Sequence, residues 1–177
     1  MKGYHYIKRG IDIILSGMAI VILSPLLLFL CIAIKLDTPG PILFKQKRVG
    51  IHRSFFQIYK FRTMRIDTPK DVPTHMLENP EQYITKVGKF LRKTSLDELP
   101  QIFNIFKGEM SIVGPRPALW NQDDLVAERE KYGANDVTPG LTGWAQINGR
   151  DELEIPDKAR LDGEYVKHLG PWMDLKC

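Results

Sequence analysis

The sequence predicts a helix-rich mixed α/β protein in which an apolar membrane segment precedes one compact domain. Residues 13–34 form a run of 22 residues without a charge. Residues 42–44 and 54–61 have the composition of short strands and flank a basic turn that contains glycine, as in a small β-hairpin. Further along, apolar side chains recur at the spacing of amphipathic helices. We therefore divide the chain into a membrane segment, residues 1–36, and a domain, residues 37–177.

The apolar run is long enough to cross a membrane, because about 20 residues at 1.5 Å rise span a hydrocarbon core of about 30 Å. Pro25 complicates this interpretation, since a proline inside a helix removes one hydrogen bond and clashes with the carbonyl four residues earlier. We expect a sharp bend or a break near Ser24, whose hydroxyl can bond a carbonyl freed there.

Basic residues flank the run on both sides and leave its topology open. Lys2, Lys8 and Arg9 precede it, and five more follow: Lys35, Lys45, Lys47, Arg48 and Arg53. The positive-inside rule therefore finds no asymmetry, which is what a re-entrant hairpin with both ends in the cytoplasm would show. A kinked span remains an equal alternative, because spanning helices also tolerate proline. A cleaved signal peptide is disfavoured, because no small-x-small pattern ends the run.

The elements after the hairpin follow in order. Residues 66–80, rich in proline and polar side chains, are expected to form a loop beside the site. Apolar residues from Ile84 to Leu91 then recur at helical spacing among basic ones, which predicts a basic amphipathic helix lying on a membrane, or else an ordinary core-facing helix. Residues 123–132 and 161–168 are expected to be short helices, and residues 139–150 a loop or short strand.

Another helix is expected to begin at Ser95. Ser95 and Glu98 have the spacing of a capping box, in which the serine caps the helix and the glutamate bonds back to it. An apolar face follows, and Gly108 is placed to end the helix.

Composition excludes several classes of protein. The formal net charge of +4 fits a protein that lies on anionic lipid or handles phosphates, and equally a weak nucleic-acid binder. The two cysteines, Cys31 and Cys177, form no disulfide framework or zinc spacing, and the four histidines lack metal-ligand spacing. Dinucleotide, P-loop, zinc-protease and serine-hydrolase motifs do not occur in the sequence.

Asp97 and Glu98 are the carboxylates that stand out. Both lie where a helix start would favour them, so capping is the simpler explanation on spacing alone. The functional alternative is that the helix terminus lowers the pKa of Asp97 and keeps it ionised as a nucleophile, while Glu98 helps to hold a divalent metal.

Arginines supply candidate phosphate ligands. Arg116 lies in the Gly-Pro-Arg-Pro segment at residues 114–117, where flanking prolines reduce the entropy lost on holding the guanidinium still. Arg150, at the end of a glycine-containing loop, is a second candidate, although a surface role is the simpler explanation. Lys60 and Arg62 add charge, but alternating strand residues usually face solvent.

Taken together, these segments resemble the bacterial sugar transferases known as monotopic phosphoglycosyl transferases. The resemblance covers nearly the whole chain. No single motif in it is specific, but the ordered series of motifs is. The series consists of Lys8, Arg9 and Asp12; Ser24 and Pro25; and residues 59–64, 95–101, 114–117, 139–143 and 148–150.

The resemblance implies that a sugar 1-phosphate passes from a UDP-sugar to polyprenol (undecaprenyl) phosphate at the cytoplasmic face of the bacterial inner membrane. UMP is released, and the intermediate is a covalent phosphosugar enzyme. It also implies a re-entrant membrane helix broken at Ser24 and Pro25, and Mg²⁺ as cofactor. A carboxylate attacking a diphosphate needs such neutralisation of charge.

Residue roles follow from the resemblance, position by position. Asp97 matches the nucleophile and Glu98 the glutamate associated with magnesium, whereas Arg116 matches an arginine near the nucleotide or its phosphates. The remaining matches are polar or basic positions associated with the active site: Lys60, Arg92, Asp162 and Asp174.

One alternative function is a membrane-anchored basic module that binds anionic lipid or nucleic acid without catalysis, with the carboxylates serving only as caps. A structural scaffold for polysaccharide assembly is another, which the intact acidic pair disfavours. Aromatic residues do not interleave with the basic ones as a stacking surface would require, so we expect no nucleic-acid partner. The expected partners are the UDP-sugar, polyprenol phosphate and membrane lipid. The sequence leaves open which sugar is carried and whether a homodimer forms.

Overall fold

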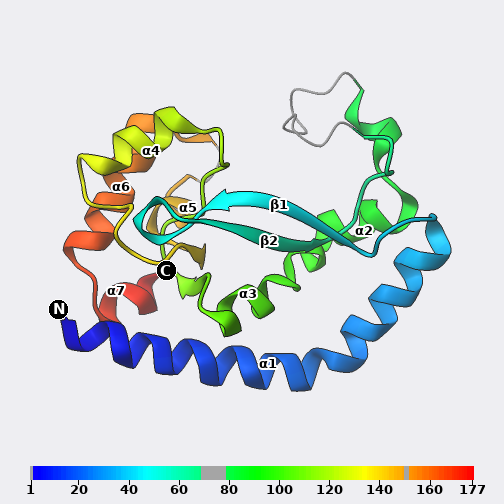
Figure 1. Cartoon of the computed structure of the whole chain (residues 1–177), viewed down its shortest axis with the longest axis horizontal. Coiled ribbons are helices and arrows are strands. Elements are labelled where there is room, and N and C mark those ends of the chain that lie inside the picture. The colour runs from blue at the N-terminus through cyan, green and yellow to red at the C-terminus, as the bar shows by residue number, and fades with distance from the viewer. Residues whose placement is uncertain (1, 69–78, 150–151) are drawn as a thin grey trace.

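The computed structural model describes residues 2–68, 79–149 and 152–177. A long N-terminal helix, α1 (Lys2–Asp37), runs along one side of the molecule, and the rest of the described chain lies on its concave side (Figure 1). The other elements are β1 (Leu43–Val49), η1 (Ile51–Arg53), β2 (Phe55–Phe61), η3 (Pro80–Tyr83), α2 (Lys86–Thr94), η4 (Leu96–Glu98), α3 (Gln101–Lys107), β3 (Ser111–Val113), α4 (Asp123–Glu130), β4 (Gly140–Thr142), α5 (Trp144–Ile147), α6 (Ile155–Lys167) and α7 (Pro171–Lys176). The helix-rich mixed α/β class is confirmed.

Helix α1 continues through Pro25 and bends without interruption (Figure 1). The Ser24 hydroxyl donates a hydrogen bond of 2.8 Å to the carbonyl of Val21. That carbonyl lies four residues before Pro25 and has lost its ordinary N–H donor to the proline ring. The expected serine contact is therefore present, and the expected helix-break-helix is corrected to one continuous, curved helix. The re-entrant topology stays a prediction.

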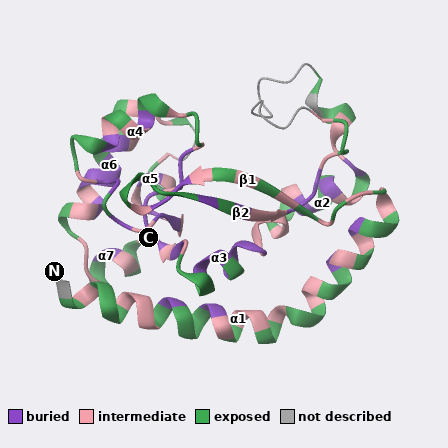
Figure 2. Ribbon diagram, viewed as in Figure 1, coloured by how far each residue is buried: buried purple, intermediate pink, exposed green. Residues whose placement is uncertain are grey.

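By length and composition, α1 qualifies to cross a membrane. Many of its apolar side chains are exposed, among them Val21 and Ile22, and Figure 2 shows the buried residues gathered mainly in the elements above it. So much exposed apolar surface on one helix is typical of a site of interaction with a membrane or another protein.

Both halves of α1 are fixed to the domain. Arg9 donates to the carbonyls of Ile105 and Phe106 at 2.6 and 2.8 Å, and so satisfies carbonyls at the end of α3. The carboxylate of Asp12 accepts the N–H of Ile112 at 3.0 Å. In the second half, Leu30 and Ile34 form a buried cluster with residues of β2 and α2. The motif at residues 8–12 thus joins α1 to α3 and β3.

The β-hairpin is confirmed, with a longer first strand than the sequence predicted. Strands β1 and β2 pair antiparallel from Leu43 opposite Phe61 to Val49 opposite Phe55. Alternation places Ile58 and Lys60 on one face of β2. Ile58 is buried against Ile105 of α3, so that face is directed towards α3 and the turn before it.

A second, parallel pair of short strands was not expected. β3 pairs with β4, with Ser111 opposite Gly140 and Val113 opposite Thr142. The approach is so close that a Cβ on Gly140 would lie 2.1 Å from the backbone nitrogen of Gly114. Glycine is therefore required at this crossing.

The helix predicted from the spacing of Ile84 to Leu91 is confirmed as α2, and the Thr85 side chain caps its start by accepting the N–H of Gly88 at 2.9 Å. Leu91 is fully buried against α1 and β2, whereas Phe90 is 56% exposed. The core-facing alternative is therefore correct for Leu91. The membrane-lying orientation of the other face stays a prediction.

The helix predicted from Ser95 is displaced. Ser95 has φ of 56°, makes no side-chain cap, and is followed by the 3-10 turn η4, while α3 starts only at Gln101. The predicted end at Gly108 is confirmed, with φ of 93°. The two later helices are confirmed as α4 and α6, although α6 starts at Ile155, well before residue 161.

Candidate active site

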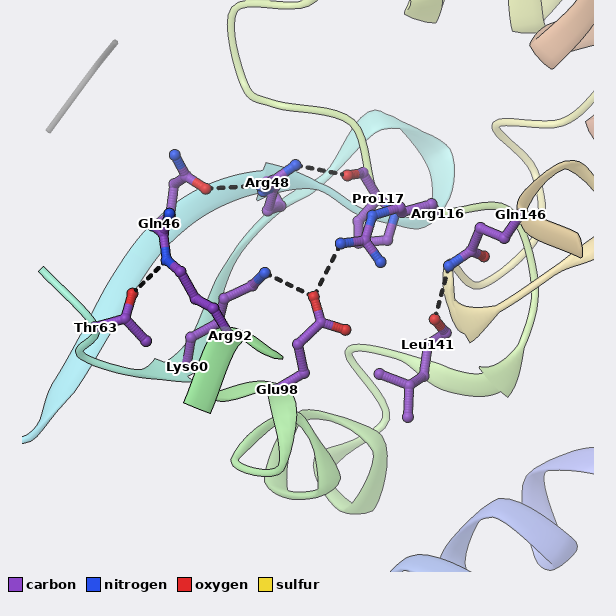
Figure 3. A network of polar contacts seen from close by, with 10 residues as sticks. All are labelled: Gln46, Arg48, Lys60, Thr63, Arg92, Glu98, Arg116, Pro117, Leu141 and Gln146. Atoms are coloured by element: carbon purple, nitrogen blue, oxygen red, sulfur yellow. Dashed lines mark hydrogen bonds and ion pairs between the residues drawn. The ribbon is translucent and has the colours of Figure 1, made fainter. Parts of the chain in front are cut away.

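Three elements bring the candidate residues together (Figure 3). Lys60 comes from β2, Glu98 from η4 and Arg116 from the turn that follows β3. The Oε1 atom of Glu98 accepts hydrogen bonds from Lys60 Nζ at 2.8 Å and from Arg116 Nη2 at 2.9 Å. One carboxylate oxygen therefore lies between two cations, beside Asp97 in the same turn.

The two carboxylates differ in their electrostatics. Burial opposes ionisation of Glu98, but Lys60 and Arg116 outweigh it and lower the pKa of Glu98 from 4.5 to about 2. For Asp97, burial dominates and raises the pKa above its ordinary value, with the nearby Lys60 and Arg92 partly opposing the rise. Glu98 is therefore held ionised, and Asp97 is a more basic carboxylate than an exposed aspartate.

The predicted capping box is wrong. Glu98 directs its side chain to Lys60 and Arg116, and only its backbone N–H bonds back to the Ser95 carbonyl, at 3.2 Å. The predicted lowering of the Asp97 pKa by a helix terminus is also wrong. The reason is that burial dominates and raises this pKa, and that Asp97 lies in the 3-10 turn η4, four residues before α3 begins.

Arg92 lies at the end of α2, close enough to Asp97 for their charges to interact. Its Nε donates to the Thr63 hydroxyl at 2.9 Å, and burial lowers the pKa of its guanidinium. Arg92 is thus a partly buried cation held at the edge of the acidic turn.

Sequence reasoning treated Arg48 only as a charge that flanks the membrane segment. In the structure, Arg48 donates to the carbonyl of Pro117 at 3.0 Å and to Gln46 at 2.7 Å, which holds the turn that carries Arg116 (Figure 3). The alternation of side chains along the hairpin strands could have indicated this role of Arg48. Gln46 and Arg48 lie opposite Ile58 and Phe56, so they share one face of the hairpin with Lys60.

The acidic pair suits a metal that is shared with a substrate. The described residues contain no group of three or more His, Cys, Asp or Glu that could hold an ion without help. Mg²⁺ usually keeps several waters and binds through one or two carboxylates plus substrate phosphates. Asp97 and Glu98 fit that pattern once a diphosphate supplies the remaining oxygens.

Two predicted acidic residues have other contacts. Asp162 is buried in α6 and forms an ion pair of 2.6 Å with Arg129 of α4. Asp174 of α7 pairs with Lys8 at 2.6 Å and accepts hydrogen bonds from the hydroxyls of Tyr4 and Tyr165, each at 2.7 Å.

Within the described residues, neither Asp162 nor Asp174 has a hydrogen bond or ion pair with Lys60, Glu98 or Arg116. Their contacts join elements of the fold, and their substrate-binding role stays a prediction. Arg150 lies outside the described residues.

Comparison with known proteins shows the family of the chain. The family model described as bacterial sugar transferase matches residues 3–177. The chain is 41% identical to UDP-glucose:undecaprenyl-phosphate glucose-1-phosphate transferase of Escherichia coli strain K12, over 96% of this chain and 38% of that protein. It is 39% identical to UDP-N-acetylgalactosamine-undecaprenyl-phosphate N-acetylgalactosaminephosphotransferase of Aeromonas hydrophila, over 97% of this chain and 42% of that protein.

A shorter relative is also similar. The uncharacterized sugar transferase EpsL of Bacillus subtilis strain 168 is 39% identical over 96% of this chain and 82% of that protein. The chain therefore spans less than half the length of the E. coli and A. hydrophila relatives and most of the length of EpsL.

Proposed function

Because the chain belongs to the bacterial sugar transferase family, we propose that it transfers a sugar 1-phosphate from a UDP-sugar to polyprenol phosphate. The products are UMP and a polyprenol diphosphate sugar. The observation that carries the proposal is the Glu98 carboxylate between Lys60 and Arg116, next to Asp97. The names of the relatives support these classes of donor and acceptor. Those names differ in the sugar, so the proposal leaves the sugar open.

In the first half-reaction, an oxygen of the Asp97 carboxylate attacks the β-phosphorus of the UDP-sugar. The bond between that phosphorus and the oxygen bridging to the α-phosphorus breaks, and UMP leaves with the bonding electrons. An acyl phosphate then joins Asp97 to the sugar phosphate. The raised pKa of Asp97 supports this role, because a more basic carboxylate is the stronger nucleophile when it is ionised.

The surrounding cations make this attack possible, because an anionic nucleophile otherwise meets a diphosphate of the same charge. Arg116 and Lys60 can exchange their contacts with Glu98 for contacts with phosphate oxygens, and the planar fork of Arg116 suits a bidentate contact. Arg92 adds positive charge near Asp97. Glu98, with Asp97, would hold Mg²⁺, which when bound neutralises charge on the diphosphate.

In the second half-reaction, an oxygen of polyprenol phosphate attacks the phosphorus of the acyl phosphate. The bond to Asp97 breaks, the carboxylate is regenerated, and the diphosphate linkage of the product forms. The acceptor presents its phosphate at the depth of the lipid head groups, so the site must lie at the membrane surface.

In this proposal, α1 holds the domain at the cytoplasmic face of the bacterial inner membrane, with both helix ends on that side. Support comes from the exposed apolar surface of α1 and from its curved course, with Pro25 inside the helix. The exposed Phe90 among the lysines of α2 suits an interfacial helix beside it.

The decisive experiment separates the covalent mechanism from direct transfer. Purified full-length protein is mixed with Mg²⁺ and a panel of UDP-sugars without polyprenol phosphate. We expect a burst of UMP no larger than the amount of enzyme, and a mass increase equal to one sugar phosphate. Adding polyprenol phosphate should then allow continuous UMP release.

Asp97→Asn keeps the size of the side chain and should abolish both the burst and the adduct. Asp157→Asn, at an aspartate that is more than half exposed on α6, is the matched control and should behave as wild type. UMP release only with acceptor present, and without an adduct, would replace the covalent step by transfer in a ternary complex. No UMP under any condition would favour the non-catalytic binding module.

A further inference from the structure

Asn104 of α3 is a fully buried polar residue that uses its whole side-chain amide. Its Oδ1 accepts the backbone N–H of Tyr59 at 3.0 Å. Its Nδ2 donates to the backbone carbonyl of Gln57 at 2.8 Å and to the carboxylate of Glu109 at 2.7 Å. A buried amide with three satisfied hydrogen bonds is held in one orientation.

These contacts replace a missing strand. Within the described residues, the sheet that contains β2 has only β1 as its other member, so the second edge of β2 lacks a strand partner. The Asn104 amide bonds the carbonyl before Ile58 and the N–H after it. A residue in a parallel neighbouring strand makes the same pair of bonds. Asn104 thus fixes α3 to β2 at one defined register.

This register determines the geometry of the candidate site. Lys60 follows Tyr59 directly on β2, while Glu98 lies on the turn that leads into α3. That turn and α3 are joined by backbone hydrogen bonds from Ile102 to Leu99 and from Phe103 to Pro100, both 3.1 Å. A shift of α3 along β2 would therefore displace Glu98 from Lys60.

We propose that Asn104 is a positioning residue that sets the distance between Lys60 and Glu98 for sugar-phosphate transfer. The kinetic part of this proposal rests on the proposed function, whereas its structural part does not. The two parts are tested separately, so that failure of one is distinguishable from failure of the other.

The structural test measures acetylation of lysine amines by mass spectrometry, on substrate-free full-length protein in nanodiscs. Lys60 is shielded, with a side chain 19% exposed and paired with Glu98. We expect Asn104→Ala to speed acetylation of Lys60 severalfold while Lys89, whose side chain is 79% exposed, reacts as before.

The matched control is Asn135→Ala. Asn135 is also a buried amide that donates to a backbone carbonyl and a glutamate, but in the segment after α4. It should leave the Lys60 acetylation rate unchanged. An unchanged Lys60 rate in folded Asn104→Ala protein, or an equal rise in Asn135→Ala protein, would overturn the proposal.

The kinetic test is a double-mutant cycle with Lys60→Met. Asn104→Ala should lower kcat by about 100-fold, the scale on which a displacement of about 1 Å affects catalysis. In the Lys60→Met background, it should cause little further loss, because the contact that it positions is already absent. Losses that multiply would refute action through Lys60. Asn135→Ala should stay near wild type in both backgrounds.

A second variant keeps the test decisive if Asn104→Ala does not fold. In the double variant Asn104→Asp with Glu109→Gln, the new carboxylate still accepts the Tyr59 N–H. The hydrogen bond with residue 109 is kept with donor and acceptor exchanged, because the glutamine amide now donates to the aspartate. Only the hydrogen bond to the Gln57 carbonyl is lost. We expect a Lys60 acetylation rate above that of wild type, and a rate equal to wild type would refute the proposal. If wild-type protein releases no UMP, the transferase function fails and acetylation alone decides the role of Asn104.

Discussion

The ion pairs of Glu98 predict a measurable acid-sensitive contribution to stability. The pKa of Glu98 falls from 4.5 to about 2 on folding. At 1.36 kcal/mol per unit, this corresponds to about 3 kcal/mol. The Glu98 side chain is only 22% exposed, so solvent screening removes little of that value.

The sign of the effect follows from the lowered pKa. The folded protein favours the ionised carboxylate, so the stabilisation is complete above the unfolded pKa of 4.5 and is lost as the pH falls towards 2. Glu98→Gln cannot ionise. We expect the variant to be less stable than wild type by about 3 kcal/mol at pH 6, and the two proteins to converge near pH 2.

Urea unfolding of the full chain in nanodiscs, with EDTA present, measures this difference across pH 2 to 6. Glu81→Gln is the control, because the side chain of Glu81 is 81% exposed and lies 3.8 Å from Lys89. Its stability should follow that of wild type at every pH. A Glu98→Gln curve that runs parallel to wild type over the whole range would refute the electrostatic reasoning, whatever the size of the offset.

Three further predictions concern catalysis and topology. Arg116→Lys keeps the charge but loses the planar fork, so kcat/KM for the UDP-sugar should fall at least about tenfold; wild-type turnover would exclude a bidentate role. Lys60→Met removes a cation that lowers the pKa of Asp97, so the acid limb of the kcat/KM profile should move to higher pH; an unmoved limb would exclude Asp97 as the titrating group. Pro25→Ala should straighten α1 and place its ends on opposite sides of the membrane; impermeant thiol labelling at both ends in intact cells checks this, and an unchanged pattern would show that the proline does not set the topology.

Local patterns predicted much of the secondary structure, because the forces behind them are local. The helix containing Leu91 and the end of α3 at Gly108 follow from apolar spacing and from the conformational freedom of glycine. The Ser24 contact follows from the carbonyl that Pro25 leaves without a donor. Each of these predictions involves residues within a few positions of one another.

Pairings distant in the chain were not predictable in this way. β3 and β4 have three residues each, which is too few for an alternation of apolar and polar residues to be recognised in the sequence. Their close approach also depends on a contact between Gly140 and Gly114, which are far apart in the chain. The Arg129–Asp162 and Lys8–Asp174 ion pairs likewise join residues far apart in sequence. A charged residue in a motif has the same appearance in sequence whether it contacts a substrate or another element of the fold.

The capping box failed for a physical reason that concerns the site itself. The Ser95 N–H donates to the Arg92 carbonyl at 3.3 Å, at the end of α2, so it is already used. The Glu98 side chain bridges Lys60 and Arg116 instead, and two cations attract a carboxylate more strongly than a backbone amide does. Ser95 adopts φ of 56°, a conformation that costs a non-glycine residue about 1 kcal/mol. That conformation ends α2 and directs η4 towards β2. The capping-box pattern therefore fails immediately before the acidic pair, at the point where the chain must turn to bring Glu98 to Lys60.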